Sequence, residues 1–254
     1  MTGTVWVSRE AGVARVVLDH PARRNAVSLA MWDELARAFS SLADSDTRVV
    51  LLRGAPGGNA FSPGADLTEF PELRGTTDKA LAYKARTHAA LETIHACPVP
   101  VLALIDGPCI GGGLEIALAA DIRLATPRST FGLPVIRLSN SADLADIRRL
   151  VQLAGASLAA EMLLTAASVP AERAYACGLV NWLGPAEDLE RVAQETAERV
   201  LAAAPRAVRL AKQGLHAPSE AAYEAGVREV LSGADFAEAT LAVLEKRTPR
   251  FTGG

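Results

Sequence analysis

The sequence is poor in the residues that build metal centres and disulfide frameworks. Its 254 residues include only three cysteines, Cys97, Cys109 and Cys177, which lie far apart. The four histidines also lack the close spacing of a metal-binding motif. We therefore expect free, buried thiols in a reducing compartment, and no metal site.

Long apolar runs and a large excess of one charge are also missing. The longest apolar stretches, such as PVPVLALIDG, are too short to cross a bilayer. The first ten residues lack the basic and then apolar segments of a secretion signal. The formal net charge of −3 gives no reason to expect nucleic acid as a partner. We expect a cytoplasmic protein that binds neither nucleic acid nor a membrane.

Patterns of strand and helix alternate along the first part of the chain. Residues 4–21 alternate around a turn at Glu10–Gly12, which predicts a hairpin. Ser28 is expected to cap a helix, and Asp78–Cys97 is expected to be helical. From about Leu144 the pattern is almost entirely helical, ending in a final helix near 219–246. Short or buried strands are expected at 47–55, 100–107, 122–126, 129–134 and 178–184. This order predicts an α/β fold.

Three consecutive glycines stand where a helix is expected to begin, in IGGGLEIALAAD (110–121). The first N–H groups of a helix have no partner inside it and carry partial positive charge. Without side chains, a ligand oxygen can approach them closely. The glycines therefore fit an oxyanion site, or else a tight strand-to-helix turn in which glycine only relieves crowding.

One acidic residue, Glu115, follows these glycines inside an otherwise apolar run. A buried carboxylate is costly unless it is paired, and its pKa tends to rise. A general acid or base near neutral pH needs that property. The alternative is a structural ion pair with a residue such as Arg123. A second loop, AFSPGADL (60–67), has the same character, so each loop could offer one N–H to an oxyanion.

Five motifs follow one another along the chain: HPARRNAVS (20–28), AFSPGADL (60–67), DGPCIGGGLEIALAADIRLAT (106–126), FGLP (131–134) and AERAYACGLVNWL (171–183). As an ordered set they resemble the enoyl-CoA hydratase/isomerase family, the crotonase superfamily. The resemblance covers nearly the whole chain. It implies a ClpP/crotonase-like α/β spiral of ββα units over residues 1–190, and a helical trimerisation region over 191–254. It also implies an acyl-CoA thioester ligand, a homotrimer or dimer of trimers, and no cofactor beyond the coenzyme A of the substrate.

The resemblance implies roles for the residues of both glycine loops. The N–H groups of Ala65 and Gly112 match the family's oxyanion hole, which holds the thioester oxygen as enolate-like charge develops. Glu115 matches the first of the two catalytic glutamates of a hydratase. In that reaction two carboxylates share a water, whose oxygen adds to the β-carbon while a proton goes to the α-carbon.

The resemblance also implies the contacts to coenzyme A. Ala65, Asp66 and Leu67 match the family's contacts to the adenine and pantetheine end. Arg23 and Arg24 precede an Asn-Ala pair where basic residues often reach the CoA phosphates. The alternative for these two arginines is a solvated pair on the surface.

The chain departs from the family pattern at the second catalytic glutamate. Val135 stands at that position, and a valine cannot hold or activate a water. Asp143 falls where dienoyl-CoA isomerases and a chlorobenzoyl-CoA dehalogenase have an acting aspartate, and His88 falls at the register of the dehalogenase's histidine. The alternatives are that Asp143 caps the following helix and that His88 is a surface residue.

Three functions remain open from the sequence. The first is an acyl-CoA hydratase or isomerase that uses Glu115, with or without Asp143. The second is a CoA-thioester hydrolase or dehalogenase-like enzyme with Asp143 as nucleophile or base. The third is a non-catalytic acyl-CoA-binding protein. A nucleotide-hydrolysing role does not fit, because no Gly-Lys-Ser/Thr follows the glycines.

Overall fold

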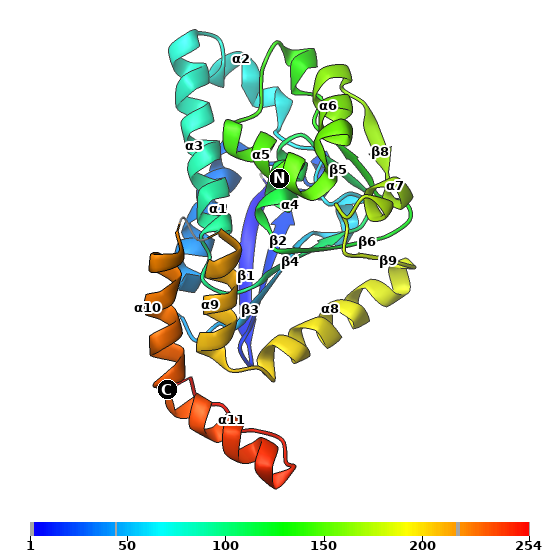
Figure 1. The fold of residues 1–254 in the computed structure, drawn as a ribbon. Helices are drawn as coiled ribbons and strands as arrows, with labels where there is room; N and C mark the ends of the chain where they lie inside the picture. The colour runs from blue at the N-terminus through cyan, green and yellow to red at the C-terminus, as the bar shows by residue number, and fades with distance from the viewer. Residues whose placement is uncertain (1–2, 44, 217–218, 254) are drawn as a thin grey trace.

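The computed structural model describes residues 3–43, 45–216 and 219–253. Their strands form two sheets (Figure 1). The larger has the order β1-β2-β3-β4-β6-β9 and is parallel except for the antiparallel pair β1–β2. The smaller has the order β5-β7-β8, with β5 and β7 parallel. The strands are β1 (Thr4–Glu10), β2 (Val13–Asp19), β3 (Val49–Gly54), β4 (Val101–Ile105), β5 (Pro108–Ile110), β6 (Ile122–Ala125), β7 (Thr130–Gly132), β8 (Ser168–Pro170) and β9 (Trp182–Leu183).

Helices cover both faces of the larger sheet and make up most of the chain after residue 143 (Figure 1). The α-helices are α1 (Leu29–Ala43), α2 (Phe70–Leu73), α3 (Thr77–His95), α4 (Gly112–Ala119), α5 (Leu144–Ala154), α6 (Ala156–Thr165), α7 (Ala171–Ala176), α8 (Ala186–Leu201), α9 (Pro205–His216), α10 (Glu220–Leu231) and α11 (Ala234–Glu245).

The central strands are buried on both faces, which parallel strands in an α/β fold require. Along β3, Val50 and Leu52 point into the main core with α1, while Val49 and Leu51 pack on the other face. Successive strand residues point to opposite faces, so one short strand serves both cores. The second core lies beneath α8, whose buried Leu189 packs against the sheet.

The expected hairpin, the Ser28-capped helix and the helix near Asp78–Cys97 are confirmed as β1–β2, α1 and α3. The expected single final helix is wrong. It is broken into α10 and α11 by Ser232 and Gly233, and Gly233 adopts an extended backbone (ψ 156°) before α11. Glycine is a poor helix former, and its presence there favours the break.

The expected boundary between a core and a helical region, at residue 190, falls inside α8. Whether the chain divides there stays a prediction. In the described part of the chain, no helix is both long and apolar enough to span a membrane.

Candidate active site

A cavity of about 460 Å³ opens where α3, the 63–68 loop and the turn before α4 meet. Its lining is mostly apolar, with Glu115 on one wall and Val135 and Asp143 on the segment before α5. Ala65 and Gly112 also line it. The residues that the sequence singled out from three separate segments therefore converge on one cavity.

The two glycine loops touch through their backbones. A Cβ added at Gly113 would lie 2.3 Å from the carbonyl oxygen of Ser62, and one at Gly64 would lie 2.9 Å from that of Ile110. Gly64 also has a φ of +105°, which L side chains rarely adopt. Glycine at these positions allows the loops to cross. The crowding that the sequence offered as an alternative for the glycine triplet is present at Gly113, and Gly64 is crowded as well.

The N–H groups of Ala65 and Gly112 are brought together by this crossing. The backbone N of Ala65 lies 3.7 Å from the point where a Cβ on Gly112 would be. Within residues 3–43, 45–216 and 219–253, neither N–H donates a hydrogen bond. Gly112 is the first residue of α4, so the positive end of the helix adds to its N–H. Two free donors on one cavity wall can bind one oxygen.

Glu115 lies one turn into α4, and its carboxyl opens on the cavity. Most of its solvation is removed by the surrounding protein, and this burial raises its pKa to about 8, with Asp146 and Asp143 adding to the rise and Lys84 opposing it. Among the described residues its carboxyl makes no hydrogen bond or ion pair. The site therefore holds a carboxyl group that keeps its proton near neutral pH.

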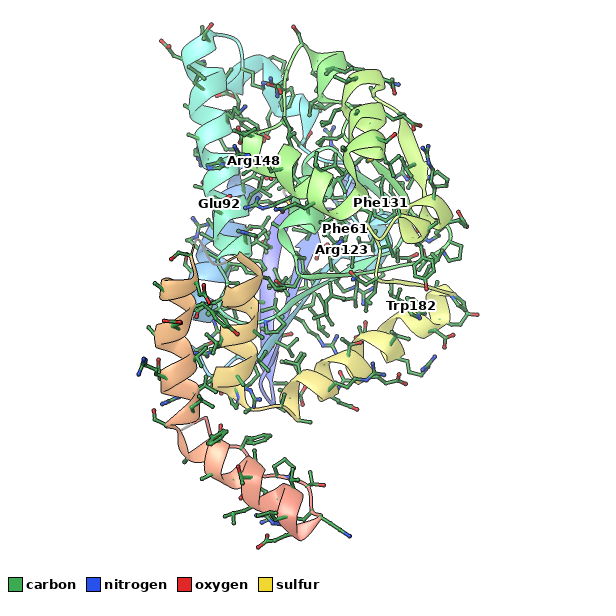
Figure 2. The ribbon with its side chains drawn as sticks, in the orientation of Figure 1. Phe61, Glu92, Arg123, Phe131, Arg148 and Trp182 are labelled. Atoms are coloured by element: carbon green, nitrogen blue, oxygen red, sulfur yellow. The ribbon has the colours of Figure 1, made fainter. Side chains whose placement is uncertain are left out.

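The structural alternative for Glu115, an ion pair with Arg123, is wrong. Arg123 is 1% exposed and lies inside the molecule (Figure 2). Its guanidinium donates instead to backbone carbonyls, among them those of Leu179 (2.7 Å) and Ala120 (2.7 Å). These bonds tie the end of α4 to β6 and to the segment before β9, and they leave Glu115 free for the cavity.

Asp143 stands at the N-cap position of α5, but its side chain makes no capping hydrogen bond. One carboxylate oxygen lies 2.8 Å from the Lys84 ammonium, and the other lies 3.4 Å from Nδ1 of His88. Both partners come from α3, which runs along the same cavity. The alternative that Asp143 caps α5 through its side chain is therefore wrong, and His88 is a partly exposed residue that contacts Asp143.

Another aspartate, Asp146, lies on α5 near Glu115 and is buried. It is 1% exposed and bonds Arg149 (3.1 Å), which reaches Glu92 (2.7 Å). Burial raises the pKa of Asp146 to about 6, although Arg149 opposes the rise. Its negative charge is the largest electrostatic contribution that raises the pKa of Glu115.

Of the residues that the sequence assigns to coenzyme A, some line the cavity and one does not. Arg23, Asp66 and Leu67 line the cavity mouth, whereas Arg24 is absent from its lining. Asp66 accepts bonds from the N–H (3.0 Å) and hydroxyl (2.7 Å) of Thr68. Burial would raise its pKa, but these bonds, with Arg23 and His20, hold it below its usual range. Asp66 therefore stabilises the loop, and of Arg23 and Arg24 only Arg23 lines the cavity.

The cavity residues that no sequence motif singles out include Trp32 on α1, and Tyr83 and Lys84 on α3. All three lie in helices whose apolar spacing predicts only ordinary packing against a core. Their convergence depends on how α1 and α3 pack together, which no local pattern reveals.

Comparisons with known proteins agree with this geometry. The sequence model of the enoyl-CoA hydratase/isomerase family matches residues 8–254. The chain belongs to the enoyl-CoA hydratase/isomerase family. A solved enoyl-CoA hydratase/carnithine racemase from Magnetospirillum magneticum is 37% identical, covers 100% of this chain and 97% of its own, and superposes with a TM-score of 0.93.

Other members of the enoyl-CoA hydratase/isomerase family are similar over nearly their full lengths. A 2,3-dehydroadipyl-CoA hydratase of Escherichia coli is 31% identical, over 97% of this chain and 98% of its own. A methylmalonyl-CoA decarboxylase of the same organism is 30% identical, over 95% of each. The expected crotonase-like α/β fold with a helical C-terminal region is confirmed, and the chain is an enzyme of the hydratase/isomerase type. No cluster of three or more His, Cys, Asp or Glu suited to a metal occurs among the described residues.

Proposed function

We propose that the protein acts on acyl-CoA thioesters and shifts a carbon–carbon double bond, as an enoyl-CoA isomerase. The observation that carries this is the single free carboxyl of Glu115 beside the two unpaired N–H groups, with Val135 where a second glutamate would stand. Moving a proton between two carbons needs one acid/base group. Adding water calls for a second carboxylate to hold the water, and valine cannot do so.

The proposed reaction uses the cavity in two proton transfers. Ionised Glu115 removes a proton from the α-carbon of a 3-enoyl thioester, and the electron pair delocalises onto the thioester oxygen. The N–H groups of Ala65 and Gly112 hold that enolate oxygen, a stabilisation commonly worth about 3–4 kcal/mol per donor. Glu115 then returns the proton to the γ-carbon, which gives the conjugated 2-enoyl thioester and restores the carboxylate.

The mouth of the cavity suits the coenzyme A end of such a substrate. Arg23 is half-exposed there, where it can pair with a phosphate, and the half-exposed Leu67 offers an apolar surface beside it. The backbone of Ala65 and Asp66 follows the same edge. We assign Arg23, Ala65, Asp66 and Leu67 to coenzyme A, with Asp66 acting through the shape of the loop.

A second candidate, a thioester hydrolase or dehalogenase-like enzyme, rests on Asp143, which lines the cavity and lies beside His88. A nucleophile needs a free oxygen lone pair aimed at the substrate. Both oxygens of Asp143 are engaged, one by Lys84 and the other by His88. These contacts favour a supporting role for Asp143, in which it holds α3 and α5 together at the cavity and adds negative charge near Glu115.

The test is an assay of 3-enoyl-CoA thioesters, followed by the absorbance of the conjugated product and by release of free thiol. We expect isomerisation whose kcat/KM rises with pH through about 8, because the base must be ionised. Glu115→Gln should lower turnover at least about a hundredfold. Hydration of crotonyl-CoA should be about two to four orders of magnitude slower than in an enzyme with both glutamates.

The matched control is Glu187→Gln, which removes an exposed carboxylate on α8 and should leave turnover unchanged. Binding of a saturated acyl-CoA, measured by calorimetry, separates lost chemistry from lost binding. Thiol release without isomerisation would favour the hydrolase. Tight binding with no turnover of any thioester would leave only a binding protein.

A further inference from the structure

Aromatic side chains line the cavity, although aromatic residues are rare in this sequence. The sequence holds three Trp, three Tyr and six Phe, and one of each kind lines this cavity: Trp32, Tyr83 and Phe70. The Tyr83 ring stands edge-on to Phe70, with centroids 5.7 Å apart and an interplanar angle of 72°. This contact limits the freedom of the Tyr83 ring within the cavity wall.

Trp32 is buried, yet its indole N–H has no hydrogen-bond partner among the described residues. It is 1% exposed, and the six-membered ring of its indole lies against Gly112, where an added Cβ would be 2.9 Å from Cζ2. Its Nε1 is the sole buried side-chain polar atom without a hydrogen-bond partner in the described part of the chain. A buried N–H without a partner costs free energy of folding, and such groups are rare in native proteins. This indole N–H is therefore a candidate for a role in the cavity.

Tyr83 lines the same cavity as Trp32, and its hydroxyl lies near this indole N–H. Burial raises the pKa of Tyr83 to about 12, and the nearby Trp32 N–H opposes that rise although its geometry falls short of a normal hydrogen bond. No other described group hydrogen-bonds to this hydroxyl. An indole N–H can only donate, so it leaves the phenolic proton of Tyr83 available to an acceptor in the cavity.

The charges around Tyr83 limit what can accept that proton. Glu69 raises the pKa of Tyr83, so a negative charge lies near its hydroxyl, and Arg74 opposes this by a smaller amount. Glu115 adds to that negative charge only when it is ionised, above about pH 8. Glu69 is fixed in place, because it accepts the N–H of Leu29 (2.8 Å). A carboxylate on the substrate would be repelled there, whereas a neutral oxygen would not.

From this juxtaposition, and resting on the proposed function, we infer that Tyr83, positioned by Trp32, forms a polar subsite for the acyl group. It selects acyl-CoA thioesters whose acyl chain carries a neutral oxygen acceptor, a hydroxyl or keto group beyond the reacting carbons. Tyr83 donates the hydrogen bond to that oxygen. Trp32 acts through Tyr83 as a positioning residue.

The test measures affinities of matched thioesters by calorimetry. The ligands are hexanoyl-CoA with its 5-hydroxy and 5-oxo derivatives, which carry the oxygen beyond the reacting carbons, and butyryl-CoA with succinyl-CoA as its anionic counterpart. We expect the wild type to bind at least one neutral oxygenated member about tenfold more tightly than its parent. Succinyl-CoA should bind no more tightly than butyryl-CoA.

Two variants assign the preference to residues. Tyr83→Phe should bring the ratio of oxygenated to parent affinity to about one, and Trp32→Phe should lower that ratio by a smaller factor. Tyr175→Phe, at a half-exposed tyrosine outside the cavity lining, should keep the wild-type ratio. Because each ratio compares two ligands on one protein, a general loss of stability cannot imitate the result.

The outcomes separate the two proposals. If acyl-CoA binds but no oxygenated member is preferred, or if Tyr83→Phe keeps the preference, the polar subsite is refuted and the proposed isomerase stands. A preference for succinyl-CoA over butyryl-CoA also refutes it, because the acceptor would then be anionic. If no acyl-CoA binds at all, both proposals fail together.

Discussion

Burial of Glu115 links the stability of the protein to pH. The folded state keeps the Glu115 proton up to about pH 8, while an unfolded chain loses it near the ordinary value of 4.5. Between these values the folded state binds more protons, so raising the pH favours unfolding. The stabilisation is fully present below about pH 4.5 and is lost as the pH rises through about 8.

We therefore expect Glu115→Gln to stabilise the protein in alkaline solution. The wild type loses up to about 1.4 kcal/mol per pH unit from this one group within the window, and glutamine has no proton to lose. Urea unfolding at pH 5 and pH 8.5 should show the variant gaining stability over the wild type only at the higher pH. The exposed Glu187→Gln should show no such gain. Equal stability of Glu115→Gln and wild type at both pH values would mean that Glu115 is solvated.

Substitution of Asp143 separates a direct from a supporting role. Asp143→Asn removes a charge that raises the pKa of Glu115, so the rise of kcat/KM should move to lower pH. Its ion pair with Lys84 is partly exposed, so the loss in unfolding free energy should be under about 1 kcal/mol. A hundredfold fall in turnover at every pH, with no shift in the profile, would instead identify Asp143 as the reacting group.

The residues that could be predicted are those whose identity is unusual for their place. A glutamate in an apolar run and glycines at the start of a helix both break local rules, and such breaks indicate chemistry. Trp32 and Tyr83 break none, because aromatic residues in helices normally pack in a core. The sequence also could not predict that Asp143 makes no capping bond, because an aspartate before a helix usually caps it.

At the scale of elements, the sequence predicts the strands and helices that have strong periodicity. It does not predict where one helix ends and the next begins. The hairpin β1–β2 and the helices α1 and α3 were predicted, because alternation and three-to-four spacing mark them. The break between α10 and α11 has no strong sequence signal, because one glycine within a helical pattern is often tolerated. Which helix packs on which face depends on contacts far apart in sequence.

One such contact ties α9 to the start of β4. Lys212 is 7% exposed, and its ammonium donates to the carbonyl of Val99 (2.9 Å) and to Asp121 (2.6 Å). The same Asp121 oxygen accepts the N–H of Val101 (2.7 Å). A buried ion pair of this kind holds a helix in one position. Removing only one partner is costly, because the other charge is then left buried without a counter-charge.

Lys212→Met should therefore lower the free energy of unfolding by about 3–5 kcal/mol, because it leaves the Asp121 charge without its cation. Adding Asp121→Asn should recover part of the loss. Lys79→Met, at an exposed lysine on α3, is the control and should change stability by under about 0.5 kcal/mol. Denaturant unfolding measures all four proteins. A loss below about 1 kcal/mol in Lys212→Met would show that α9 is held by apolar packing alone.

At the scale of the whole molecule, α11 stands apart from the body of the protein (Figure 1). Its side chains include the exposed apolar residues Phe236 (49%), Leu241 (51%), Val243 (77%) and Leu244 (75%). An apolar helix surface of this kind is unfavourable in water and is typical of an interface. We expect another copy of the chain to cover it, in the homotrimer or dimer of trimers that the family resemblance implies.

The double substitution Val243→Asp and Leu244→Asp tests this expectation. Two charges on that surface would have to be desolvated in an interface, whereas they are harmless in a monomer. Light scattering on a sizing column should show particles of three or six wild-type chains, and smaller particles for the variant at the same concentration. Leu164→Asp, at a leucine on α6 that is equally exposed (76%), should leave at least a trimer. A wild-type monomer, or a variant that assembles as the wild type does, would show that α11 does not form the interface.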